Sequence, residues 1–172
     1  PQEIMACTHL VTDKVRRTVK FLSGFSTCPH IVHKSFIERS HERGVWLDEQ
    51  RHQLRDSNSE RKWGFKIRDS LRAARNFLKG KRFFVTKETK PSKADMKVIL
   101  ACAGGVAVEN EPKSFHDDVL VVAEEETSQV KRLNRLGYTI YNKELVLTGV
   151  LRQTLLDKDD SVILLQTPSS ST

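Results

Sequence analysis

The residues best suited to chemistry in this sequence are three cations, Arg16, Arg17 and Lys20, at the predicted start of a helix. A short apolar strand over 9–11 comes before them, and the helix is expected to begin near Arg17 and Thr18. The first turn of a helix has unpaired backbone N–H groups and a partial positive charge, so it attracts anions. Three cations there repel that charge unless an anion is bound. The segment therefore predicts an anion site, with a basic helix start tolerated by solvent as the alternative.

No residues form a recognisable catalytic or metal-binding motif. The sequence has no Gly-rich phosphate loop, no GxSxG nucleophile elbow and no HExxH zinc motif. Residues 103–105 (AGG) are interpreted as the C-terminal cap of a helix. His30 and His33 are three apart in a predicted strand, so their side chains point to opposite faces and cannot share one ion. We therefore expect no enzyme activity, no cofactor and no metal.

The elements that would position this helix start belong to an internal repeat. Residues 7–48 and 117–157 both predict a strand, an amphipathic helix, a second strand and a second helix. After a loop two residues shorter in the second copy, Ile31 aligns with Ile140. The pairs aligned before that loop, at a separation of 111, are Val11 with Val122, Val19 with Val130 and Lys20 with Lys131.

The second copy is also preceded by an upstream half. Residues 81–86 predict a strand rich in aromatic and β-branched side chains, 91–102 predict a helix, and 106–108 predict another strand. The complete unit then runs strand-helix-strand-strand-helix-strand-helix, with apolar strands typical of a parallel sheet covered by helices. The first copy has only seven residues before Thr8, so its opening strand and first helix are expected to be missing from this chain.

The segment that joins the two copies has a mixed character. Residues 50–58 are polar and loop-like, whereas apolar side chains alternate with basic ones over 60–77. Apolar residues at 67, 71, 74 and 78 form a helical stripe, which predicts one linker helix packed against both units. The expected divisions are a first unit over 1–48, a linker over 49–78, a second unit over 79–165 with a possible last strand at 162–165, and a disordered tail over 166–172.

Composition limits the class of protein. The chain has 172 residues and a formal net charge of +7, which suits an anionic partner such as nucleic acid, a phosphoprotein or an acidic tail. No apolar run is long enough to predict a transmembrane helix, and the first residues do not resemble a signal peptide. Three cysteines without CxxC spacing favour a reducing compartment.

The residues that define these elements resemble a known family. The strings THLVTD, RRTVKFL and HIV in the first copy, and FFVT, CAGG and LTGVL in the second, resemble the tandem BRCT repeats of DNA-damage mediator proteins. The resemblance covers residues 7–157 and is most specific at 17–22 and 147–151. It implies an α/β fold of two BRCT units, each a small parallel four-stranded sheet flanked by helices, joined by a linker helix. The first unit would be incomplete at its N-terminus.

The resemblance also implies a phosphoserine-peptide site between the two units. Lys20 matches the lysine that binds the phosphate in this family, and Thr18 lies beside it. The family's other phosphate ligands, a Ser or Thr hydroxyl and a glycine N–H, belong to the segment before Thr8. Arg17 matches the arginine that binds the third residue after the phosphoserine, through its backbone or a terminal carboxylate. The residues expected around this C-terminal end of the peptide are Leu22, Pro91, Asp95, Glu144 and Thr148.

Ordinary structural roles would also explain several of these residues. Glu144 and Thr148 are four apart on one helix face and can form a simple surface contact. Pro91 fits the first position of a helix. Phe36 and Leu145 stand where the family has a tryptophan in its last helix, and both are expected in the core.

We expect a non-enzymatic nuclear adaptor on chromosomes that binds a phosphorylated protein tail in the DNA-damage response. If Arg17 binds a terminal carboxylate, the partner must end three residues after the phosphoserine, which favours a histone tail of the pattern phosphoSer-Gln-x-Tyr-COOH. The alternative is a BRCT pair that dimerises, or holds other repair proteins, independently of phosphate. Direct nucleic-acid binding ranks lower because aromatic and basic residues do not interleave on one strand face. No membrane association is expected.

Overall fold

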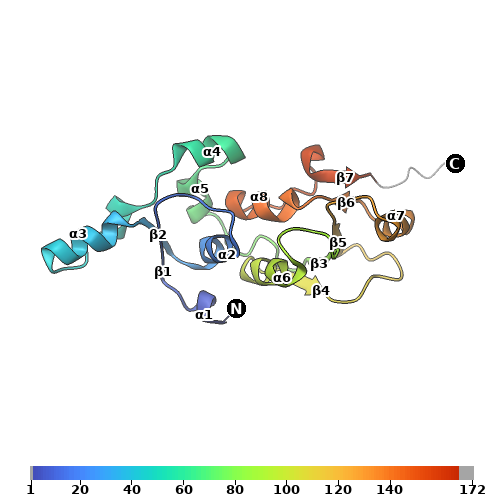
Figure 1. Cartoon of the computed structure of the whole chain (residues 1–172), viewed down its shortest axis with the longest axis horizontal. Helices are drawn as coiled ribbons and strands as arrows, with labels where there is room; N and C mark the ends of the chain where they lie inside the picture. Colours follow the sequence, from blue (N-terminus) through green and yellow to red (C-terminus); the bar gives the residue numbers. More distant parts are fainter. Residues whose placement is uncertain (1, 167–172) are drawn as a thin grey trace.

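The computed structural model describes residues 2–166 and contains two sheets, which lie on either side of helices α2, α6 and α8 (Figure 1). The first sheet has two parallel strands, β1 (His9–Thr12) and β2 (His30–His33). The second has five strands in the order β4-β3-β5-β6-β7. These strands are β3 (Arg82–Val85), β4 (Val106–Val108), β5 (Val119–Val122), β6 (Ile140–Tyr141) and β7 (Ile163–Leu165).

The first unit is the short strand-helix-strand-helix form that the sequence predicts. A short helix, α1 (Gln2–Met5), precedes β1. Between the strands runs α2 (Val19–Thr27), and α3 (Ser35–Arg43) follows β2. The helix α2 begins directly after Thr18, because the Thr18 side chain accepts a hydrogen bond from the Phe21 N–H and so caps the first turn. The predicted helix start is confirmed.

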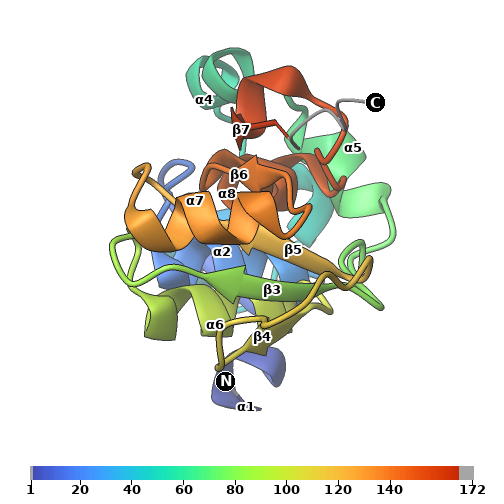
Figure 2. The same ribbon diagram turned by 90° about the vertical axis from the view of Figure 1, so that its right-hand side faces the viewer.

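The second unit has the full predicted order of elements. Its helices are α6 (Lys93–Cys102), α7 (Ser128–Arg135) and α8 (Glu144–Arg152). Four strands are parallel, and β7, after the short 3-10 helix η2 (Asp160–Val162), adds an antiparallel edge. In Figure 2, α7 covers the near face of the sheet, and α6 and α2 lie behind it. The predicted α/β fold, with parallel strands flanked by helices, is therefore confirmed.

The strands of the two units keep the alignment predicted from the sequence. Leu10 pairs with Ile31 in the first sheet, and Val121 pairs with Ile140 in the second. The predicted alignment places Leu10 on Val121 and Ile31 on Ile140, so the paired residues of the two sheets correspond. The repeated strands therefore share one register.

The helices α2 and α7, in contrast, are shifted by two residues from the predicted alignment. Thr18 and Thr127 each cap their helix by accepting a hydrogen bond from the N–H three residues further on. In the second unit the loop that is two residues shorter therefore lies between β5 and α7. The predicted alignment had placed the shorter loop after α7. As a result Lys20 corresponds to Gln129, and the predicted match with Lys131 is wrong.

The linker does not form the single helix predicted over 60–77. It contains a 3-10 helix, η1 (Glu49–His52), and two short helices, α4 (Ser57–Trp63) and α5 (Ile67–Arg72). Gly64, with a φ of 60°, ends α4 in the left-handed region, where residues with a Cβ are strained. The divisions at 1–48, 49–78 and 79–165 stay predictions, and the predicted tail, apart from Gln166, lies outside the described residues.

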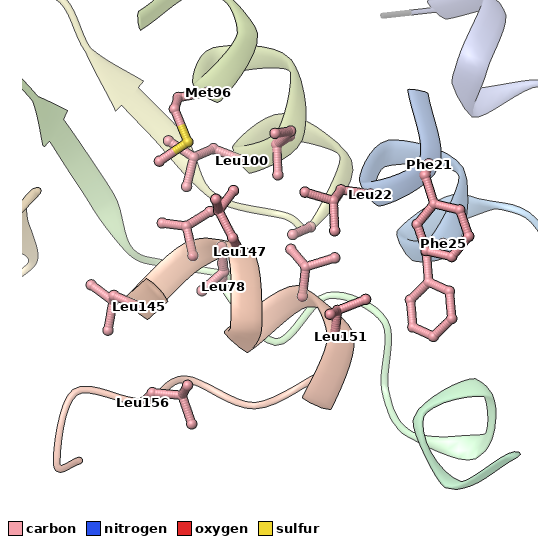
Figure 3. Packing of buried hydrophobic residues seen from close by; sticks show 14 of the residues in the cluster. Phe21, Leu22, Phe25, Leu78, Met96, Leu100, Leu145, Leu147, Leu151 and Leu156 are labelled. Atoms are coloured by element: carbon pink, nitrogen blue, oxygen red, sulfur yellow. The ribbon is translucent and has the colours of Figure 1, made fainter. Parts of the chain in front are cut away.

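The main core lies where the two units meet. The side chain of Leu22 on α2 points between α6 and α8 and is fully buried (Figure 3). Around it lie Met96 and Leu100 from α6 and Leu147 and Leu151 from α8. Each large aliphatic side chain buried in this way contributes about 1.5–3 kcal/mol. This packing holds the start of α2 in place relative to α8.

Two further expectations concern the core and the membrane. Phe36 and Leu145, which stand where the family has a tryptophan, are both buried, as predicted. Within residues 2–166, none of the helices combines the length and the apolar character that a membrane span requires.

Candidate binding site between the two units

The start of α2 carries one exposed cation and two paired ones. Lys20 lies in the first turn and is exposed, and no ion pair with it occurs among the described residues. Arg16, in contrast, donates to Asp13 at 2.9 Å on the surface. Arg17 is paired with Glu144. Two of the three cations expected to oppose the charge of the helix start therefore have carboxylate partners, and Lys20 is the one that remains exposed.

Arg17 crosses from the first unit to the second. Its Nη2 donates to both carboxylate oxygens of Glu144, at 2.7 and 2.9 Å, and its guanidinium lies 5.7 Å from the ring centroid of Trp63 in α4. Nε of Arg17 is buried and has no hydrogen-bond partner among the described residues. The guanidinium is thus held between α8 and the linker. A charge-assisted pair of this kind fixes the orientation of the arginine as well as its position.

Glu144 is ionised and its oxygens are already in use. Burial alone would raise the pKa of this carboxyl, but the hydrogen bonds from Arg17 and Thr148 outweigh burial and lower it. The Thr148 hydroxyl donates to Glu144 at 2.5 Å, and Asn142 Oδ1 accepts the Glu144 N–H at 2.8 Å. With these partners, Glu144 positions Arg17.

A second ion pair ties the start of α6 to the start of α8. Glu124, after β5, accepts the Lys90 N–H at 2.9 Å and pairs with Lys143 at 2.5 Å. Lys90 precedes Pro91, and Lys143 precedes Glu144. These contacts connect the Pro91 segment with the end of α8 that holds Arg17.

Local capping accounts for the residues at the start of α6. Ser92 is the N-cap: its Oγ accepts the Asp95 N–H at 3.2 Å and donates to the Asp95 carboxylate at 2.9 Å. Pro91 precedes this cap and is half-buried. The interpretation of Pro91 as the first helical residue is therefore wrong, because Ser92 already takes the capping position after it.

The structure brings some predicted site residues together and separates one from them. Arg17, Glu144 and Thr148 form one hydrogen-bonded group. Thr18 and Lys20 lie on the same helix start. The Lys90 N–H, next to Pro91, is linked to this group through Glu124 and Lys143, whereas Asp95 hydrogen-bonds to Ser92. Leu22 has no exposed surface and packs in the core between the units (Figure 3). The binding roles of all eight residues stay predictions.

Two residues of this arrangement were missed in the sequence. Neither Trp63 nor Glu124 was among the predicted site residues. Nothing local to Glu124 indicates that Lys143 is its partner, because the two come together only through the neighbouring strands β5 and β6.

Family comparison identifies both halves of the chain. Residues 76–161 match the model of the BRCT domain. Residues 1–54 match the model of the BRCT domain of Regulator of Ty1 transposition protein 107.

Two curated relatives cover most of the chain. PAX-interacting protein 1 of Mus musculus is 37% identical over 162 residues, which are 87% of this chain and 15% of the relative. Mediator of DNA damage checkpoint protein 1 of Pan troglodytes is 31% identical over 168 residues, which are 96% of this chain and 8% of the relative. The chain therefore spans a small part of each relative.

Solved structures share the fold at low sequence identity. The BRCT5-BRCT6 domains of S. pombe Brc1 superimpose with a TM-score of 0.73 at 20% identity, covering 90% of this chain and 82% of that one. Residues 820–1070 of Rtt107p superimpose with a TM-score of 0.63 at 13% identity, covering 91% and 75%. From the family match, the relatives and the two repeated α/β units, we conclude that this chain belongs to the BRCT domain family.

Proposed function

We propose that the chain binds a phosphorylated peptide between its two BRCT units and acts as an adaptor in the DNA-damage response. The observation that carries this proposal is the start of α2. There Lys20 stands exposed in a capped first turn, and Arg17 nearby is fixed by Glu144 of the other unit. A peptide laid across this helix start would meet cationic groups at two points, one for a phosphate and one three residues away.

The charge on Lys20 suits a phosphate. A phosphoserine carries about −1.5 to −2 charges and three strong acceptors. The ammonium group of Lys20 and the free N–H groups at the start of α2 can donate to those oxygens. Each charge-assisted hydrogen bond contributes about 1.5–3 kcal/mol, which is enough to make binding depend on phosphorylation.

The Arg17 guanidinium suits the end of the peptide. Two of its hydrogen bonds go to Glu144, and an arginine has five donors, so donors remain for a second carboxylate. We propose that the ligand is a histone tail of the pattern phosphoSer-Gln-x-Tyr-COOH. The names of the relatives support a role in the DNA-damage response, and with it a place in the nucleus on chromosomes. A structure of Rtt107p in complex with a phosphorylated histone, with a TM-score of 0.61 at 12% identity, has the same fold as this chain.

Fluorescence anisotropy with three labelled peptides of one sequence tests the proposal. The peptides are phosphorylated with a free C-terminus, unphosphorylated with a free C-terminus, and phosphorylated with an amidated C-terminus. Each is titrated with this chain and with a version extended upstream by about one strand and one helix, the segment in which the family resemblance places the other phosphate ligands. We expect tight binding of the first peptide only.

The phosphate part and the carboxylate part of the proposal are contradicted by different results. Equal binding with and without phosphate, in a folded extended protein, would contradict the phosphopeptide function. Equal binding of the free acid and the amide would contradict the carboxylate role of Arg17 and leave the phosphate role intact. The comparison of the two protein lengths measures what the upstream segment adds.

A phosphate-independent interaction is the second candidate, because apolar side chains are exposed after β2. Ile37, Val45 and Trp46 are 42%, 61% and 76% exposed, which is unusual for large apolar residues close together in sequence. Sedimentation velocity at several protein concentrations tests self-association. A mass that rises with concentration and falls in Trp46→Ser would support a dimer through this segment.

A further inference from the structure

We propose that His9, His30 and Glu49 form a binding site for a divalent metal ion, with Zn²⁺ the ion that their chemistry suits best. The site is formed by the strands of the first unit and the start of the linker, and it lies on the face of β1 and β2 opposite α2. His9 stacks on Phe36 of α3 on this face, whereas its neighbour Leu10 points towards α2. The proposal is therefore independent of the phosphopeptide function.

Strand register places the two histidines side by side. His9 is the pairing partner of His30 in the parallel sheet, so both side chains project from the same face. Their ring centroids lie 4.8 Å apart. Glu49 Oε1 lies 3.5 Å from His9 Nε2, and one ligand atom from each of the three residues lies within 4.8 Å of the other two.

The third ligand is held in place by the backbone of the linker. Glu49 is the first residue of η1, and the chain after η1 is tied to β2 in two ways. The Leu54 N–H donates to the Ile31 carbonyl at 2.9 Å, and Gln53 forms an antiparallel bridge with Val32. Glu49 is therefore brought to the histidines by the tertiary structure of the first unit.

An unpaired ring nitrogen independently suggests a ligand. His9 Nε2 is inaccessible to solvent and has no hydrogen-bond partner among the described residues. Its other ring nitrogen, Nδ1, is 2.9 Å from the Thr8 hydroxyl. Metal-binding histidines typically have this arrangement, with one nitrogen held by a neighbouring polar group and the other facing the ion. The distance of 3.5 Å to Glu49 is too long for a good hydrogen bond, but it leaves space for an ion to approach both groups.

The ligand set fits zinc with one open position. Two imidazoles and one carboxylate are a known zinc ligand set, in which water or another ligand takes the fourth place. Ligand atoms on a tetrahedral zinc lie about 3.3 Å apart, given bonds of about 2.0–2.2 Å, so the three side chains need to move together by only about 1–1.5 Å. All three are half-buried and can rotate. His30 and Glu49 also line a cleft of about 640 Å³, through which water can reach the open position.

The sequence pointed to a different pair of histidines. His33, considered together with His30, has its Nδ1 2.9 Å from the Ser35 hydroxyl and lies outside the cluster. The partner of His30 is His9, which is 21 positions earlier and becomes its neighbour only through strand pairing. The expectation of no metal was based on His30 and His33, which are not the two histidines that lie side by side.

Zinc titration of the metal-free chain tests the site. ZnCl₂ is added in competition with a chromophoric chelator, to the wild-type chain and to H30Q and E49Q. We expect one zinc ion per chain and a loss of affinity of at least about tenfold in each variant, because each removes one of three ligands. The matched controls are H33Q, in the same strand, and Cys7→Ser, at an exposed cysteine; both are expected to bind zinc like the wild type.

Two further measurements separate a true site from surface binding and from misfolding. The Co²⁺-loaded chain is expected to show tetrahedral absorption bands without a thiolate charge-transfer band. Zinc at about one hundred times the wild-type Kd is expected to raise the melting temperature by roughly 5–10 °C in the wild type and in H33Q, and by at most about half as much in E49Q at the same zinc concentration.

Several results would overturn the proposal. They are the absence of saturable zinc binding, equal affinity in H30Q and H33Q, and loss of binding in Cys7→Ser. If H30Q does not fold, E49Q decides the matter alone, because Glu49 lies on a short helix at the surface and its replacement leaves the sheet intact.

Discussion

The helices α2 and α7 occupy equivalent places in the two repeats, but the residues around their starts carry opposite charge. Each begins after a threonine whose side chain caps the first turn. The loop before α7 contains three glutamates over 124–126, and acidic residues near a helix start offset its partial positive charge. The loop before α2 contains Arg16 and Arg17, and Lys20 follows inside the first turn. One helix start thus follows acidic residues, and the other is surrounded by basic ones, of which Lys20 is exposed.

The two starts also differ in what their charged residues hold together. Glu124, before α7, pairs with Lys143 of its own unit. Arg17, before α2, pairs with Glu144 of the other unit. Because Lys143 and Glu144 are adjacent, the start of α8 receives both contacts. The charged residue before α7 therefore stabilises the second unit internally, whereas the charged residue before α2 connects the two units.

The largest effect is expected from removing the exposed cation of α2. Lys20→Ala should weaken binding of the phosphorylated peptide by roughly 10- to 150-fold, because one or more charge-assisted hydrogen bonds to phosphate are lost. Lys131→Ala is the matched control, since it removes an exposed helical lysine from α7. It should change the affinity less than about twofold. Fluorescence anisotropy measures both, and equal losses in the two variants would show that only net charge matters.

The next effect concerns the two ion pairs at the start of α8. Glu144→Ala should lower the free energy of unfolding by about 1–2 kcal/mol, because it leaves the largely buried guanidinium of Arg17 without its carboxylate. Glu124→Ala should cost less than about 1 kcal/mol, since Lys143 can turn to solvent. Urea denaturation of both variants measures the difference. A larger loss in Glu124→Ala would reverse the ranking of the two contacts.

Removing either helix cap should destabilise the protein by the same amount, but only one of the two changes should weaken peptide binding. Thr18→Ala and Thr127→Ala should each lower the free energy of unfolding by about 1 kcal/mol, because each removes an acceptor for a first-turn N–H. Only Thr18→Ala should also weaken the phosphopeptide, whose phosphate would lie at that helix start. Thr18→Ser, which keeps the hydroxyl, serves as the control. Weaker binding in Thr127→Ala would contradict the assignment of the site to α2.

The smallest effect is expected in the pH dependence of stability. The pKa of Glu144 is lowered: burial opposes ionisation, but the hydrogen bonds from Arg17 and Thr148 prevail. A lowered pKa in the folded state stabilises the protein above the unfolded value of about 4.5, and this contribution is lost as the pH falls through the folded value. The stability difference between wild type and Glu144→Gln should therefore shrink between about pH 6 and pH 3. A difference that stays constant over this range would contradict the charged pair.

Much of the fold could be predicted because its signals are local. Short apolar runs predicted β1, β2, β3 and β5, and the apolar periodicity at 91–102 predicted α6 to within two residues of its start. The start of α2, expected near Arg17 and Thr18, was predicted to within two residues. The single linker helix was wrong: Gly64, with a positive φ, ends α4 before the apolar stripe begins, and α5 ends at Arg72, before the stripe ends.

The candidate site was predictable only in part, because only some of its residues are marked by local signals. Lys20 was found as one of three cations at a predicted helix start, which is a local property, and Thr18 was added beside it from the family resemblance. The role of Glu144 as the partner of Arg17 was not found, because the two are 127 positions apart and meet only when α2 packs on α8. Leu22, predicted beside a peptide pocket, is instead fully buried by that same packing.

The sequence by itself determined the repeat, the order of its elements, the family resemblance and the basic start of α2, since each depends on neighbouring residues or on a pattern that occurs twice. The tertiary structure alone decided which charges are paired and which stay exposed. It also brought His9, His30 and Glu49 together. Such choices depend on long-range packing and strand register, which place side chains distant in sequence within a few ångströms of each other.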